Sequence, residues 1–99
     1  MTTPTDILLE PAQTYRQVPD IMTTMLDGDA VLLNATTGGI FGLNRTASAI
    51  WEGFANPTDA VSVAEGLVRR FTVSIEEATE SVRRTGGALL AAGMLQPAA

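Results

Sequence analysis

The hydrophobic pattern of this chain changes its period near residue 44, and no other feature of the sequence constrains the fold as strongly. Residues 21–43 hold three short apolar runs, separated by Asp27-Gly28 and by the turn-forming residues 35–38, which indicates three strands joined by tight turns. After residue 44 the apolar residues recur at intervals of three and four, as they do on one face of a helix. The sequence therefore predicts an α+β fold in which a three-stranded antiparallel sheet precedes three helices.

Start and stop signals place these elements along the chain. The expected strands lie at residues 21–26, 30–33 and 39–43. The first helix is expected to begin at a cap provided by Asn44 or Thr46 and to stop before Pro57. The second is expected to begin between residues 59 and 62, where Ser62 opens a capping box.

The third helix contains two glycines that need an explanation. Ser74 and Glu77 form a capping box at its start, and Gly93 is expected to end it in a left-handed cap. Gly86 and Gly87 lie inside it, and each costs roughly 1 kcal/mol relative to alanine in a helix interior. Three explanations stay open: close packing against the sheet, a pocket left open for a ligand side chain, or a kink.

Residues 1–20 are expected to form a loosely ordered arm in front of the domain, which spans residues 21–96. Three prolines interrupt any regular element in this arm: Pro4, Pro11 and Pro19. Leu8, Leu9 and Tyr15 could hold the arm against the core or against a second subunit, and a partly disordered tail is the alternative.

The amino-acid composition removes most of the side chains that enzymes use. The chain has no Cys and no His, and all six basic residues are Arg, so Lys is missing too. The commonest general acid/base, the thiolate and imidazole metal ligands and the Schiff-base lysine are therefore all absent. Carboxylate pairs such as Asp27 with Asp29 have a sufficient structural explanation beside a tight turn. The sequence predicts no catalysis, no metal site and no cofactor.

The net charge of −5 argues against a nucleic-acid partner, because a protein that neutralises phosphates needs the opposite balance. No apolar run approaches the ~20 residues of a membrane span. The first six residues lack the basic start and apolar centre of a signal peptide. A cytoplasmic protein without a membrane partner is the expectation.

Several segments together resemble the PqqD-like family, the precursor-peptide recognition elements of ribosomal peptide natural product biosynthesis. The resemblance covers roughly residues 22–95 and is carried by residues 30–34, 40–44, 46–52, 67–71 and 89–95. Its most specific parts are the Leu33-Asn34 strand end, the helix sequence Ala49-Ile50-Trp51-Glu52 and the Gly93-Met94-Leu95 finish.

The resemblance implies a winged-helix-like fold that binds the leader segment of a precursor peptide as an added β-strand. Members of the family present that leader to an enzyme, a radical SAM protein in the PqqD system and a leader protease in lasso-peptide systems. The implied groove lies between the last strand and the third helix. Its expected residues are Gly39, Ile40, Phe41, Gly42 and Leu43 on the strand, with Ala78, Val82, Arg83, Thr85, Gly86 and Leu89 on the helix.

The residues give this role a physical basis. Strand addition needs an edge with free backbone groups, and Gly39 and Gly42 let a ligand backbone approach closely. Alternation along the strand sends Phe41 and Leu43 to the core face and Ile40 to the other face. Arg83 is a candidate to pair with acidic leader residues, and local pairing with a glutamate is the alternative.

Two other functions stay open at this point. A winged-helix DNA-binding regulator is compatible with the topology, although a helix that opens with Glu76, Glu77 and Glu80 would repel phosphate. A self-associating structural subunit, such as a homodimer, is favoured by an unprotected strand edge and by an arm that can exchange between copies.

Overall fold

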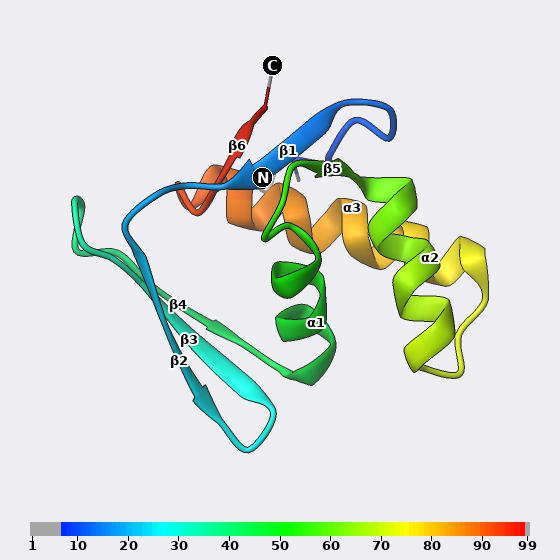
Figure 1. The fold of residues 1–99 in the computed structure, drawn as a ribbon, viewed down its shortest axis with the longest axis horizontal. Coiled ribbons are helices and arrows are strands. Elements are labelled where there is room, and N and C mark those ends of the chain that lie inside the picture. The colour runs from blue at the N-terminus through cyan, green and yellow to red at the C-terminus, as the bar shows by residue number, and fades with distance from the viewer. Residues whose placement is uncertain (1–6, 99) are drawn as a thin grey trace, which may run out of the picture.

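The computed structural model describes residues 7–98 of the chain, in which nine elements follow one another (Figure 1). Their bounds are β1 (Thr14–Gln17), β2 (Ile21–Leu26), β3 (Asp29–Asn34), β4 (Ile40–Leu43), α1 (Arg45–Gly53), β5 (Thr58–Asp59), α2 (Ala60–Arg70), α3 (Ile75–Ala91) and β6 (Leu95–Pro97). The strands form two separate antiparallel sheets of three strands each, in the orders β2-β3-β4 and β5-β1-β6. The predicted succession of a three-stranded sheet and three helices is confirmed.

The β2-β3-β4 sheet forms where the sequence predicts it. Asp27 and Gly28 both have positive φ angles, of 53° and 88°, as a tight hairpin turn requires. The turn pairs Leu26 with Asp29, and the register then runs without interruption to Ile21 opposite Asn34. Because the turn and both strands are adjacent in sequence, local signals are sufficient to specify this hairpin.

The second sheet is absent from the sequence prediction. The sequence predicts a loosely ordered arm before residue 21, whereas Thr14–Gln17 form β1 between β5 and β6. Tyr15 pairs with Thr58 on one side and with Pro97 on the other, so the partners of β1 come from far along the chain. Strands of two to four residues are too short to show a period of their own.

Side-chain caps fix where each helix begins. Asn44 rather than Thr46 caps α1, and its Oδ1 accepts a hydrogen bond from the main-chain N of Ala47 at 2.9 Å. Asp59 caps α2 in the same way, so the helix starts before the capping box that was expected at Ser62. The predicted capping box between Ser74 and Glu77 is present at the start of α3, with both reciprocal hydrogen bonds formed.

The core lies between one face of the β2-β3-β4 sheet and the helices, and α1 is the element that connects them (Figure 1). Phe54 is fully buried and meets the Tyr15 ring edge-to-face, with 6.5 Å between the ring centroids. Trp51 is buried as well, and its Nε1 donates a hydrogen bond to Thr23 Oγ1 of β2 at 3.3 Å. A buried tryptophan whose N–H has a partner acts as the predicted core anchor.

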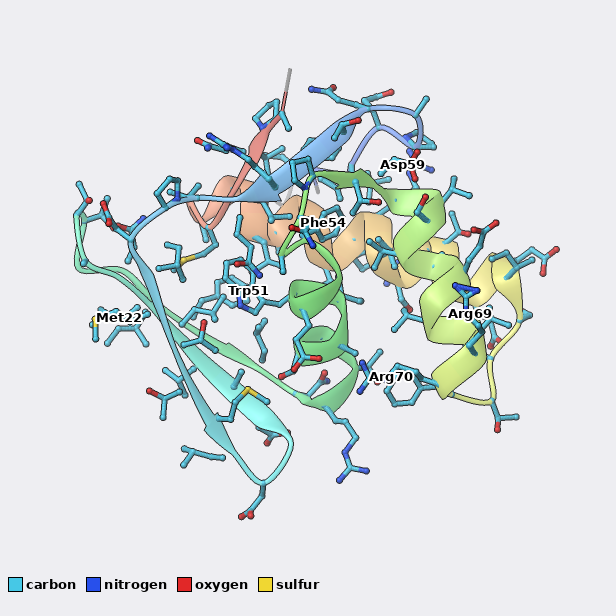
Figure 2. All side chains as sticks on the ribbon, in the orientation of Figure 1. Met22, Trp51, Phe54, Asp59, Arg69 and Arg70 are labelled. Carbon is cyan, nitrogen blue, oxygen red and sulfur yellow. The ribbon has the colours of Figure 1, made fainter. Side chains whose placement is uncertain are left out.

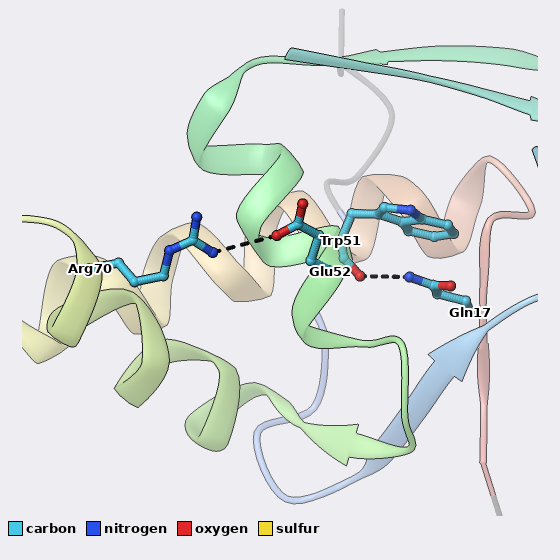
Figure 3. Close-up of polar contacts among 4 residues, drawn as sticks. All are labelled: Gln17, Trp51, Glu52 and Arg70. Atoms are coloured by element: carbon cyan, nitrogen blue, oxygen red, sulfur yellow. Dashed lines mark hydrogen bonds and ion pairs between the residues drawn. The ribbon is translucent and has the colours of Figure 1, made fainter. Parts of the chain in front are cut away.

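Polar contacts also tie α1 to its neighbours (Figure 3). The main-chain oxygen of Trp51 accepts a hydrogen bond from Gln17 Nε2 at 2.8 Å, which joins α1 to β1. Glu52 forms an ion pair with Arg70 at the end of α2, with 3.5 Å between the charged atoms. Both side chains of this pair are more than half exposed, so its contribution to stability is small.

Candidate functional site

The β4 strand forms an edge of its sheet. Among the described residues it pairs with β3 alone. The main-chain N of Asn34 donates to the Gly39 carbonyl at 2.9 Å, which fixes the phase of the ladder between the two strands. Because backbone groups alternate in direction along an antiparallel strand, the N–H and C=O groups of Ile40 and Gly42 point away from β3. These groups are the ones that a further strand would use.

The side chains of β4 alternate between the two faces of the sheet. Leu43 is buried and Phe41 packs against the core. Ile40 is 73% exposed on the opposite face, and a Cβ atom added at Gly42 would have nothing within 4 Å. This is the alternation that the sequence predicts. The free edge is therefore flanked by one large apolar side chain and by a residue with no side chain.

The helix half of the predicted groove is not open in this structure. Val82 and Leu89 are fully buried, Ala78 and Gly86 are buried, and Thr85 is half-buried. Ala78, Val82 and Leu89 contribute to the core of the domain, and the contact of this stripe with a leader peptide stays a prediction. An apolar stripe at helical spacing has the same appearance in a sequence whether the protein or a ligand covers it.

The two glycines of α3 lie beneath the N-terminal arm. A Cβ atom on Gly86 would overlap the side chain of Leu9, which is fully buried. A Cβ atom on Gly87 would overlap the main-chain carbonyl of Ile7 and lie 3.1 Å from Leu8 Cα. Because α3 is continuous from Ile75 to Ala91, the glycines cause neither a break nor an open pocket. Close packing is the correct explanation, and the packing partner is the arm and not the sheet.

Arg83 is the second contact between α3 and the arm. Its Nε donates a hydrogen bond to the Leu9 carbonyl at 2.8 Å, and its own carbonyl accepts one from the Leu9 main-chain N at 3.1 Å. The neighbouring Arg84 pairs locally with Glu80 at 2.6 Å in an exposed position. Part of the hydrogen-bonding capacity of Arg83, a candidate from the sequence to pair with acidic leader residues, is thus used within the chain.

Asn34 connects the loop before β4 to the end of α3, and sequence reasoning did not identify this role. Its side chain is buried, and Oδ1 accepts hydrogen bonds from the main-chain N atoms of Thr36 and Thr37 at 2.9 and 3.1 Å. Its Nδ2 donates to the Gly93 carbonyl at 3.1 Å. A buried amide whose partners lie on two segments fixes their relative position, so Asn34 holds β4 in place against the C-terminal end of α3.

A shallow hollow of about 390 Å³ lies between Leu8 of the arm and the first half of α3. Leu8 and Ile75 are apolar residues of its lining, and Glu76 and Arg83 are charged residues of the same lining. The sequence does not predict this hollow, because its two sides come from segments almost seventy residues apart.

Within residues 7–98, acidic side chains do not gather in groups of three or more that could hold a metal ion. Every helix in the same range is too short or too polar to cross a membrane. The main-chain N–H and then the hydroxyl of Ser62 lower the pKa of the Asp59 carboxyl below its ordinary value, which is a property of a helix cap.

The fold and the free edge of β4 define a small α+β domain with an open edge strand in its β2-β3-β4 sheet. A family model described as coenzyme PQQ synthesis protein D (PqqD) matches residues 29–95, about two thirds of the sequence. The chain belongs to the PqqD family. No curated protein matches the sequence.

Two solved structures share the fold. "TbiB1 in complex with the TbiA(beta) leader peptide" aligns with a TM-score of 0.75 and 21% identity, over 85% of this chain and 98% of that chain. "Lasso peptide synthetase B1 complexed with the leader peptide" aligns with a TM-score of 0.71 and 26% identity, over 84% and 98%. Both similar proteins were thus solved with a leader peptide bound.

Proposed function

We propose that this protein binds the leader segment of a ribosomally made precursor peptide as a strand added to β4. The observation that carries the proposal is the free edge of β4, where Ile40 and Gly42 direct unpaired backbone groups outward. Membership of the PqqD family and the two leader-bound structural neighbours support the same assignment. The module performs no catalysis of its own in this proposal.

The chemistry of strand addition defines the ligand. Backbone hydrogen bonds supply affinity for any extended segment, and selectivity comes from the ligand side chains that reach the surfaces beside the edge. One set of alternate side chains would lie next to the exposed Ile40 and the other next to the half-buried Phe41. The preferred leader segment is therefore extended, free of proline at its paired positions, and apolar on both faces.

The bound leader is then presented to a partner enzyme, either a radical SAM protein or a leader protease. A cytoplasmic location, where precursor peptides are made, accompanies this proposal. The edge strand that binds the leader is also able to pair with a second copy of the chain, which gives a homodimer that competes with leader binding.

Isothermal titration calorimetry with the leader encoded beside this gene tests the proposal. The expected dissociation constant is micromolar or tighter, which corresponds to about −8 kcal/mol at 1 μM. A scrambled peptide of the same composition is the control and should bind much more weakly. The proposal fails if the native leader releases no heat at tens of micromolar while the protein is folded.

A further inference from the structure

The outer face of the β2-β3-β4 sheet, turned away from the helices, is apolar and exposed. The register places Met22, Leu33 and Ile40 in one row across this face and Thr24, Val31 and Gly42 in the next. Met22 and Leu26 are each 59% exposed, Ile40 is 73% exposed and Val31 is 36% exposed. In Figure 2 the Met22 side chain points away from the helices, on the opposite side of the sheet from Trp51.

This composition is unusual for a solvated face. An antiparallel sheet that packs on one side normally alternates apolar residues inward with polar residues outward. Here β3 directs Ala30 and Leu32 into the core and directs Val31 and Leu33 outward, so both of its faces are apolar. Contiguous exposed apolar surface of this kind is typical of a docking site for another protein.

The charges around this face favour a different protein over a second copy of the chain as its binding partner. Asp20, Asp27 and Asp29 are all exposed at its rim, and the segments that join the strands contain no basic residue. The ion pairs found in residues 7–98 include none of these three carboxylates. Arg45 lies beside Gly28, at one end of the sheet. A second copy of the chain packed face to face would bring acidic rims together, whereas a partner with a basic rim would be attracted.

We propose that this outer face, defined by Met22, Leu26, Val31, Leu33 and Ile40, docks the enzyme that processes the precursor. The enzyme surface that fits has an apolar centre and basic residues around it. This inference rests on the proposed function, because Ile40 belongs to β4 and a leader strand added there would continue the outer face. The enzyme then contacts the sheet and the outward side chains of the leader together, so it binds the loaded module more tightly than the empty one.

The variant Met22→Thr/Leu26→Thr/Val31→Thr tests the surface. Threonine favours strands, and these three side chains lie outside the proposed leader-binding edge. The probe is the purified processing enzyme encoded beside this gene, titrated with the module in the presence and absence of the leader. We expect the variant to bind the enzyme at least about tenfold more weakly, as loss of several apolar anchors does at protein interfaces, with unchanged leader affinity.

A matched control replaces exposed apolar side chains by threonine on α2, away from the sheet. Val61 and Val68 on α2 are 41% and 38% exposed, so Val61→Thr/Val68→Thr should leave enzyme binding unchanged. A second variant, Asp27→Asn/Asp29→Asn, keeps the apolar side chains and should slow association at low salt and flatten its salt dependence. This rim variant tests the proposal independently should the threonine variant fail to fold.

The possible results separate this inference from the proposed function. If the unchanged protein does not bind its leader, the proposed function is wrong. The tighter binding of the enzyme to the leader-loaded module is then wrong as well. The docking surface alone is overturned if the leader binds normally and the enzyme binds the unchanged protein, the Met22→Thr/Leu26→Thr/Val31→Thr variant and the Asp27→Asn/Asp29→Asn variant with equal affinity. The surface is also refuted if the unchanged, leader-loaded module fails to bind the enzyme, or if the threonine change only dissociates a dimer in sedimentation experiments.

Discussion

Leu9 and Arg83 hold each other through two hydrogen bonds, although 74 residues separate them in the sequence. The Leu9 main-chain N donates to the Arg83 carbonyl at 3.1 Å, and Arg83 Nε donates to the Leu9 carbonyl at 2.8 Å. The Leu9 side chain is fully buried over Gly86. The arm is therefore held against α3 at Leu9 by hydrogen bonds to its main chain and by a buried side chain. This contact covers part of the α3 surface, which is then not accessible to a ligand.

The tight contact over Gly87 predicts a reversal of the usual glycine-to-alanine effect. In a helix interior this change normally stabilises by up to about 1 kcal/mol. Gly87→Ala should instead destabilise by roughly 1–3 kcal/mol, because its Cβ would overlap the Ile7 carbonyl. Urea unfolding measures the difference. Gly66→Ala on α2 is the control and should show the usual gain, since its Cβ meets nothing within 4 Å. A gain at both positions would mean that the arm does not rest on α3.

The burial of Val82 predicts the outcome of adding a charge to α3. If Val82 lined an open groove, as the sequence predicts, Val82→Glu would abolish leader binding and leave the fold intact. The structure places Val82 fully inside the core, so an unpaired carboxylate there should cost more than about 3 kcal/mol or prevent folding. Circular dichroism and urea unfolding show whether Val82→Glu is folded as well as the unchanged protein, is destabilised, or does not fold. Ser81→Glu, at the adjacent exposed position, should stay within about 0.5 kcal/mol of the unchanged protein. A well-folded Val82→Glu protein would contradict the packing described here.

The free edge of β4 predicts that proline at position 42 blocks strand addition without unfolding the sheet. The Gly42 N–H points away from β3, so its loss leaves the β3–β4 ladder intact. The proline ring would also occupy the space of an incoming strand. We expect Gly42→Pro to weaken leader binding at least about tenfold, while the melting temperature stays close to that of the unchanged protein. Gly42→Ala keeps the N–H and should bind normally; equal affinity of all three proteins would place the leader elsewhere.

Sequence reasoning succeeded where structure is local and failed where partners are distant. The Asp27-Gly28 hairpin and the Ser74–Glu77 capping box are each complete within a few residues, so their side chains identify them. By contrast, the strands that pair with β1 lie more than forty residues away in the sequence. No local sequence signal near Tyr15 predicts its pairing with Thr58.

The candidate site divides in the same way. The open edge follows from β4 being the last strand of a local meander, and the sequence predicts it. The covering of Gly86 and Gly87 depends on Ile7 and Leu9 at the other end of the chain. A single sequence shows that two glycines in a helix need a reason, but not which segment provides it.

The cap at Asp59 predicts a stability change in acid. Because hydrogen bonds from Ser62 lower the pKa of the Asp59 carboxyl in the folded protein, the unfolded chain binds this proton more readily. The resulting stabilisation is fully present above the unfolded pKa of about 3.9 and is lost as the pH falls through the lower folded pKa. Asp59→Asn keeps a good cap but cannot titrate.

The free energy of unfolding of the unchanged protein minus that of Asp59→Asn should therefore rise between about pH 2 and pH 5 and stay level above it. Urea titrations at a series of pH values measure this difference. Asp59→Ala should cost about 1 kcal/mol at neutral pH, because it removes the acceptor for the Ser62 N–H. A difference between the unchanged protein and Asp59→Asn that is constant across the acid range would show that the carboxylate is not bound to the helix start in solution.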